Sequence, residues 1–158
     1  MNVAVSYVAL IISAFAFAFG IFTWRDRKRQ DMRDLFLQLH ERLHDVQLQR
    51  GRRILYQVCS EDDAAALFHQ RSEDYDFANK ALWLLDIAAL YAEQGYVDRE
   101  LFMQEWGFVY AAISKHGRHF INERIRRTAI SARFAWPHFQ SLAEQAVERN
   151  RSYDERTT

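Results

Sequence analysis

The chain has 158 residues, of which 49% are hydrophobic and 15% are aromatic, and its 21 Lys and Arg balance its 21 Asp and Glu. This composition excludes a disordered chain, and a single cysteine excludes a disulfide scaffold. A net charge of zero argues against a general nucleic-acid-binding protein, so we expect no nucleic-acid partner. The length predicts one domain rather than two.

The charges are distributed unevenly along the chain. None of the first 24 residues is charged, and 19 of them are apolar. Residues 3–24 would form a helix about 33 Å long, which matches the ~30 Å hydrocarbon core of a bilayer. A cleaved signal peptide is the main alternative, but no Lys or Arg precedes the apolar run. We therefore expect a transmembrane helix over residues 3–24, with the lipid bilayer as a partner.

A basic cluster follows the apolar run and predicts its orientation. Positively charged residues flank the cytoplasmic end of a span, so the domain after Trp24 should be cytoplasmic and the N-terminus outside. The predicted localisation is the inner (cell) membrane, with a single pass. We expect a juxtamembrane flank and helix over 25–50, a helical bundle over 51–150 and a frayed polar tail over 151–158. The membrane-flanking residues are Arg25, Arg27, Lys28 and Arg29.

The rest of the chain predicts an all-α fold, with a bundle of about four to six helices. No alternating strand pattern and no Asn-Gly or Asp-Gly turn occurs after residue 24. The first helix should continue from the membrane until Gly51 ends or bends it. Its apolar side should be the short heptad-like stripe Met32, Phe36, Leu39, Leu43 and Val46.

Later helix boundaries are marked by capping residues. Ser60 and Ser72 precede acidic residues and should begin helices, whereas Gly95 should end the second of these. Asp98 should cap the next helix, which Gly117 bends. Trp136-Pro137 should begin the last helix, because proline suits the first helical position.

Asp86 lies in the most apolar helical segment, 81–90. An unpaired buried carboxylate is costly, and arginines lie on a later helix that can pack nearby. We therefore predict a partly buried ion pair between Asp86 and Arg124 or Arg127.

The sharpest chemical motif is His40-Glu41-Arg42-Leu43-His44, a literal H-E-x-x-H. On a helix the two histidines can bind one zinc ion and the glutamate can activate its water. The expected zinc ligands of this alternative are His40 and His44, with Glu41 as the catalytic base. No third ligand beyond a residue such as Glu61 is evident, and Leu39 and Leu43 mark the opposite, core-facing side. We therefore expect a solvated surface, no cofactor and no catalytic residue.

Other groups of residues suggest weaker alternatives. His116, His119 and Glu123 have the spacing of a metal face on a helix, although Gly117 weakens that helix. The arginines from Arg118 to Arg133 form a basic run that could contact nucleic acid or phospholipid, although pairing with acids of neighbouring helices is the simpler interpretation. The single cysteine, Cys59, follows an apolar stretch and is expected in the core.

Four short residue patterns follow one another along the chain. They are Arg53-x-Leu55-Tyr56, Leu85-Asp86-x-x-Ala89-Leu90-x-x-x-x-Gly95-x-Val97, Phe102-x-x-x-Trp106 and Ile121-x-x-x-Ile125-Arg126. With the N-terminal span, this pattern resembles a group of small bacterial membrane-anchored proteins of unknown function. The resemblance implies a single-span protein with a helical cytoplasmic domain, and it supplies no catalytic residues.

These observations together predict a membrane-tethered, non-enzymatic helical interaction module at the cytoplasmic face. A protein partner or a homo-oligomer is expected. The alternative is a zinc-dependent hydrolase that uses the histidine motif.

Overall fold

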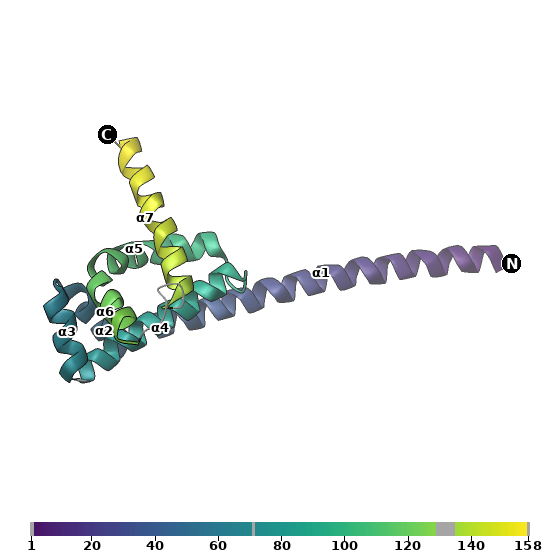
Figure 1. The fold of residues 1–158 in the computed structure, drawn as a ribbon. Coiled ribbons are helices and arrows are strands. Elements are labelled where there is room, and N and C mark those ends of the chain that lie inside the picture. The colour runs from purple at the N-terminus through teal and green to yellow at the C-terminus, as the bar shows by residue number, and fades with distance from the viewer. Residues whose placement is uncertain (1, 71, 129–134, 158) are drawn as a thin grey trace.

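The computed structural model describes the backbone of residues 2–70, 72–128 and 135–157; within these ranges it does not describe the side chains of residues 2–12, 14, 70 and 152–157. Over these residues the fold is all-helical, with seven helices and no strand, which confirms the all-α part of the predicted fold. A long N-terminal helix extends away from a bundle formed by the rest of the chain (Figure 1). The helices are α1 (Asn2–Leu43), α2 (Val46–Gln57), α3 (Glu61–Gln70), α4 (Glu73–Glu93), α5 (Arg99–His116), α6 (Arg118–Thr128) and α7 (Pro137–Thr157).

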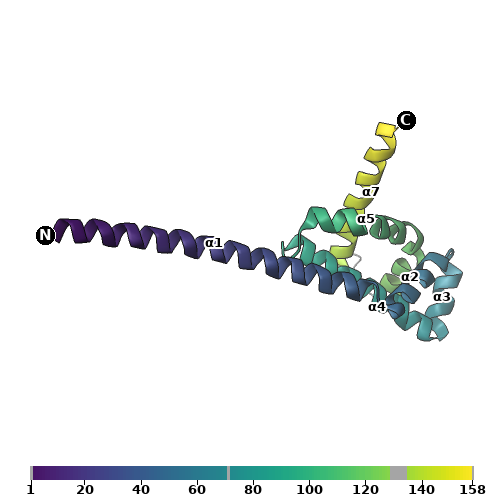
Figure 2. The ribbon, with the colours of Figure 1, turned by 180° about the vertical axis from the view of Figure 1, so that it is seen from behind.

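Helix α1 is one uninterrupted helix of 42 residues. Its last third packs on the bundle through apolar positions such as Leu39 and Leu43, which are buried. Its first part leaves the bundle and has no neighbouring helix in either view (Figures 1 and 2). The prediction that the N-terminal helix runs without a break into the following domain is therefore confirmed.

The end of α1 differs from the expectation. The helix ends at Leu43, not at Gly51, because the Asp45 carboxylate accepts a hydrogen bond from the Gln47 backbone N–H at 2.8 Å and thereby caps α2. Val46 lies beyond this break and is 79% exposed, so it does not extend the apolar stripe.

Gly51 lies inside α2, where it allows close packing against α4 and does not end a helix. A Cβ atom there would overlap the Phe77 carbonyl oxygen and lie 2.8 Å from the Ala81 Cβ, both on α4. The glycine lets the two helix backbones approach, a role that is different from the helix stop we expected.

Most of the predicted caps are confirmed. Ser60 and Asp63 form a reciprocal capping box, in which each backbone N–H donates to the other side chain at 3.1 Å. Gly95 has φ +70° just after α4, and the Asp98 carboxylate accepts from the Leu101 N–H at 2.9 Å. Pro137 begins α7. Ser72 precedes α4 without a side-chain capping bond.

Helix α4 lies at the centre of the bundle and packs against α2, α5 and α7, while α3 packs against α6. Its buried face meets large side chains of the neighbouring helices. The Tyr110 hydroxyl on α5 donates to the Leu85 carbonyl oxygen at 2.6 Å, and burial raises the pKa of this phenol well above its usual value. The largest fully buried side chains include Tyr110, Phe102, Phe120, Phe139, Leu55 and Leu142.

The predicted ion pair between Asp86 and an arginine is wrong. Asp86 is half-buried, and its carboxylate accepts a hydrogen bond from the Phe139 backbone N–H in the first turn of α7, at 2.9 Å. The arginines have other partners: Arg124 donates to the Tyr75 hydroxyl, and Arg127 to Glu123. A helix N-terminus therefore replaces the expected cation.

The chain also remains helical where a frayed tail was expected. Helix α7 continues to Thr157, and its far end extends away from the bundle (Figure 1).

Candidate functional site

The two histidines of the H-E-x-x-H motif lie side by side at the end of α1. Their ring centroids are 4.5 Å apart, and both rings contact Trp106 of α5, at 5.7 Å from His40 and 5.2 Å from His44. His40 is half-buried and His44 is exposed. The motif therefore forms an aromatic cluster between α1 and α5.

Two nitrogens of this cluster, His40 Nδ1 and Trp106 Nε1, are buried and have no hydrogen-bond partner among the described residues. The guanidinium of Arg52 lies 5.6 Å from the Trp106 ring and donates to the Leu43 carbonyl oxygen at the end of α1. Burial lowers the pKa of Arg52, although the guanidinium stays charged at neutral pH. The histidine motif does not indicate Arg52 or Trp106 as members of this cluster, because neither residue belongs to the motif.

The described residues do not complete a metal site around the pair. No group of three or more His, Cys, Asp or Glu side chains in the described ranges could hold a metal ion. Glu41, the catalytic base of the zinc alternative, lines an open cleft where α1, α2 and α4 meet, and no third ligand among the described residues joins His40 and His44. Two ligands from one helix would leave a zinc ion without the three protein ligands that catalytic sites use.

The second candidate metal face is engaged in other contacts. Glu123 is 6% exposed and accepts hydrogen bonds from Arg126 at 2.7 Å and from Arg127 at 2.5 Å. These guanidiniums lower the pKa of Glu123 to about 2. His116 instead packs edge-on against Tyr56.

The basic run on α6 is mostly paired within the bundle. Besides the contacts of Arg126 and Arg127 with Glu123, the Arg124 guanidinium lies 5.3 Å from the Trp136 ring. Arg133 lies outside the described residues. The expected pairing with acids of neighbouring helices is therefore wrong for these three arginines. Arg126 and Arg127 pair with Glu123 of their own helix, and Arg124 contacts the Tyr75 hydroxyl and the Trp136 ring instead of an acid. Cys59 is exposed, which corrects its expected place in the core.

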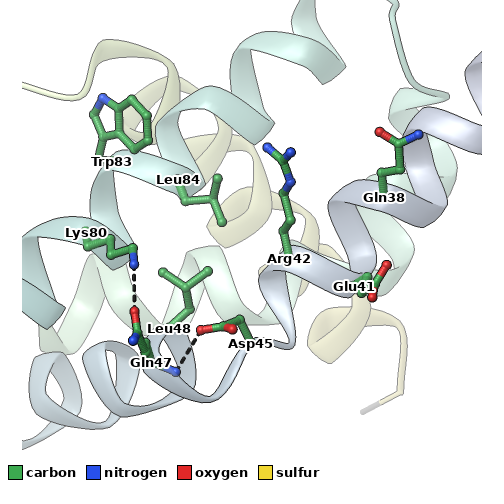
Figure 3. A pocket seen from close by; sticks show the side chains of 9 residues that line it. All are labelled: Gln38, Glu41, Arg42, Asp45, Gln47, Leu48, Lys80, Trp83 and Leu84. Atoms are coloured by element: carbon green, nitrogen blue, oxygen red, sulfur yellow. Dashed lines mark hydrogen bonds between the residues drawn. The ribbon is translucent and has the colours of Figure 1, made fainter.

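An open cleft lies where α1, α2 and α4 meet, with a volume of about 720 Å³. Figure 3 shows side chains of α1 on one side and side chains of α4 on the other, with the start of α2 between them. Its lining residues are Gln38, Glu41, Arg42, Asp45, Gln47, Leu48, Lys80, Trp83 and Leu84.

The cleft combines charges of both signs with one large aromatic ring. Lys80 Nζ donates to Gln47 Oε1 at 2.7 Å, whereas Glu41 and Arg42 form no ion pair with any residue that the structure describes. Trp83 is 58% exposed although it belongs to the most apolar segment of the chain. That exposure could not be read from the sequence, which predicts an all-round buried helix there.

The outer part of α1 carries a group of exposed aromatic side chains. The large side chains Phe15, Phe17, Phe19, Phe22 and Trp24 are 64% to 73% exposed. Where the structure describes side chains, which leaves out those of residues 1–12 and 14, no helix has both the length and the apolar character needed to cross a membrane. Half of the expected span 3–24, residues 3–12 and 14, thus falls on residues whose side chains are not described.

Comparisons with known proteins give no assignment. No family model, no curated protein and no solved structure matches the chain.

Proposed function

We propose that the protein is a membrane-tethered, non-enzymatic helical module, whose bundle is held at the cytoplasmic face of the membrane and binds a protein partner there. The observation that carries this proposal is the group of exposed aromatic side chains on the outer part of α1. Large apolar side chains in water are unfavourable, and contiguous exposed groups of them mark interaction or membrane surfaces.

The aromatic residues lie on two opposite sides of the helix instead of forming one stripe. With about 100° of rotation per residue, Phe15 and Phe17 point about 160° apart, and Trp24 lies about 180° from Phe15. A single protein partner would cover only one of these sides. An apolar solvent on all sides, such as lipid, covers them all, and a helix that is apolar all round is typical of a membrane segment.

The charged residues that follow support one orientation. Arg25, Arg27, Lys28 and Arg29 are all exposed next to Trp24, and the Lys28 ammonium lies 5.9 Å from the Trp24 ring. Basic residues beside a span favour the cytoplasmic side, and tryptophan favours the interface. The proposal therefore places the bundle in the cytoplasm and the N-terminus outside.

Membrane association is tested by flotation and alkaline extraction of membranes from cells that express the full chain. The wild-type protein should stay with the membrane. Phe17→Arg/Phe19→Arg should release it, because an arginine in the span costs about 2.5–3.5 kcal/mol, whereas the matched control Phe17→Leu/Phe19→Leu should remain bound. Extraction of the wild-type chain by alkali would overturn the tether.

Orientation can be tested with the exposed thiol of Cys59, because it is the single cysteine of the chain. A membrane-impermeant maleimide should label Cys59 only after the cells are permeabilised. The matched control Asn2→Cys/Cys59→Ser should be labelled in intact cells. The opposite pattern would reverse the topology.

The cleft between α1, α2 and α4 supports partner binding. Its volume falls in the range of ligand pockets, and exposed tryptophans are frequent energetic centres of protein interfaces. Because the lining carries two acids and two bases, we expect it to bind a partner segment with both charge signs instead of a polyanion.

A photo-crosslinking amino acid at position 83 in native membranes tests this surface. We expect a discrete adduct that Arg42→Glu abolishes. The same probe at Phe108, which is 73% exposed on α5, should give no adduct that depends on Arg42. Equal adducts at both positions would count against the cleft.

A further inference from the structure

A second, smaller cavity lies between α1 and the start of α5, with a volume of about 210 Å³. It is separate from the cleft of Figure 3 and lies closer to the outer part of α1. Its lining residues are Arg29, Met32, Arg33, Phe36, Asp98 and Leu101.

Two arginines contribute most of the charge of this cavity. Arg29 and Arg33 are exposed, lie one helical turn apart on one face of α1, and form no ion pair with any described residue. The one acid in the lining, Asp98, already accepts the Leu101 N–H that it caps. With Asp98 still charged, the lining carries one net positive charge, and its two guanidiniums have no ion-pair partner among the described residues. Paired guanidiniums favour phosphate because they can bind it in a bidentate manner.

The remaining wall is apolar. Met32 and Phe36 are half-buried, and Leu101 is 43% exposed at the edge. Apolar walls lower the local dielectric constant and focus the field of the arginines, so an anion is held more strongly here than on an open basic surface.

The position of the cavity along α1 fits the headgroup layer. At 1.5 Å per residue, Arg29 lies about 7.5 Å and Arg33 about 14 Å beyond Trp24. Side chains on a helix lean back toward its N-terminus, by about one turn for a long side chain. Both guanidiniums then approach the polar layer, which extends roughly 5 to 7 Å beyond the hydrocarbon core.

One end of the bundle would face the headgroup layer of the proposed membrane. Both views show that the turn between α4 and α5 is the part of the bundle nearest the N-terminal end of α1 (Figures 1 and 2). Tyr96, in this turn, is 56% exposed, and tyrosine is enriched at membrane interfaces. The cavity thus lies between the basic flank of α1 and this end of the bundle.

We propose that this cavity binds the phosphate of an anionic phospholipid through Arg29 and Arg33, and so fixes the bundle against the bilayer surface. This proposal rests on the proposed membrane tether. It differs from a general attraction of the basic flank, because it assigns lipid selectivity to two particular arginines and not to the whole cluster.

The test uses the full chain reconstituted in phosphatidylcholine vesicles that contain a trace of spin-labelled phosphatidylglycerol or spin-labelled phosphatidylcholine. The motionally restricted fraction of each probe gives its relative association with the protein. We expect a preference for phosphatidylglycerol that Arg29→Gln/Arg33→Gln lowers about tenfold. The matched control Arg25→Gln/Arg27→Gln removes the same charge outside the cavity and should lower it less than about threefold.

The other outcomes distinguish failure of the lipid site from failure of the tether. Equal losses in the two double variants, or no preference in the wild-type chain, would overturn the lipid site and leave the tether intact. Failure of the wild-type chain to insert into neutral vesicles would overturn the tether, and this proposal with it. Inorganic phosphate should displace the probe no more than sodium chloride of equal ionic strength; stronger displacement would overturn the lipid assignment in favour of a free phosphate ligand.

Discussion

The carboxylate of Asp86, in the middle of α4, accepts a hydrogen bond from the backbone N–H of Phe139 in the first turn of α7, at 2.9 Å. The two residues are 53 positions apart in the sequence. One acid of the central helix therefore satisfies a donor that the start of the last helix cannot satisfy internally, and its charge is favourable next to the positive end of the helix dipole.

Removing this acceptor should destabilise the bundle. We expect Asp86→Ala to lower the free energy of unfolding by about 1–2 kcal/mol, the usual cost of losing a helix cap. Asp86→Asn should cost less, because its amide oxygen still accepts from Phe139. Thermal unfolding in detergent, followed by circular dichroism, compares the two. Equal losses would indicate that the charge matters more than the hydrogen bond.

Glu123 should make stability depend on pH in the acidic range. Its pKa is lowered to about 2 in the folded protein by Arg126 and Arg127, from a usual value of 4.5. Its contribution is therefore complete above about pH 4.5 and is lost as the pH falls toward 2. Wild-type melting temperature should fall through this window, and Glu123→Gln should melt lower at pH 7 with a flatter acid profile. Parallel profiles of the two proteins would contradict the assignment.

Gly51 and Gly107 offer a matched pair of helical glycines. Gly51→Ala should destabilise by about 1–3 kcal/mol, because the new methyl group overlaps the Phe77 carbonyl on the neighbouring helix. Gly107→Ala should be neutral or stabilise by up to about 1 kcal/mol, since its Cβ would meet only ordinary contacts at 3.7 and 3.9 Å. Denaturant unfolding measures both changes. A Gly51→Ala variant as stable as wild type would show that α2 and α4 can separate freely.

The histidine pair should not confer zinc-dependent stability. Because only two candidate ligands of the described part of the chain meet at the end of α1, saturating zinc should shift the melting temperature by less than about 1 °C. A closed site would stabilise by several kcal/mol. Differential scanning fluorimetry with and without chelator measures this. A larger shift that His40→Ala/His44→Ala abolishes would instead establish a metal site.

The sequence predicts the helices better than their contacts. Ser60, Gly95, Asp98 and Pro137 act locally, so their residue types alone place helix ends correctly. Gly51 differs from these residues, because a glycine usually indicates a helix end but here allows close packing. Its role depends on Phe77, which is distant in the sequence and close only in the fold.

The same distinction explains the site residues. The sequence predicts that Asp86 is a partly buried acid that needs a partner. A backbone N–H carries no residue-type signal, so the sequence points to an arginine and not to the Phe139 N–H. The sequence does not indicate the cleft, because Trp83 lies in an apolar run whose side chains are expected to be buried. The H-E-x-x-H spacing predicts that His40 and His44 lie side by side on one helix. It does not predict their contact with Trp106, because this residue belongs to another helix.

The continuity of α1 has a mechanical consequence. A helix without an internal proline or break transmits both tilt and rotation, so the outer segment and the bundle turn as one lever. Each residue inserted between Trp24 and Met32 would rotate the bundle by about 100° around the axis and shift it by about 1.5 Å. The length of this connecting stretch therefore determines which side of the bundle is aligned with a given side of the outer segment of α1.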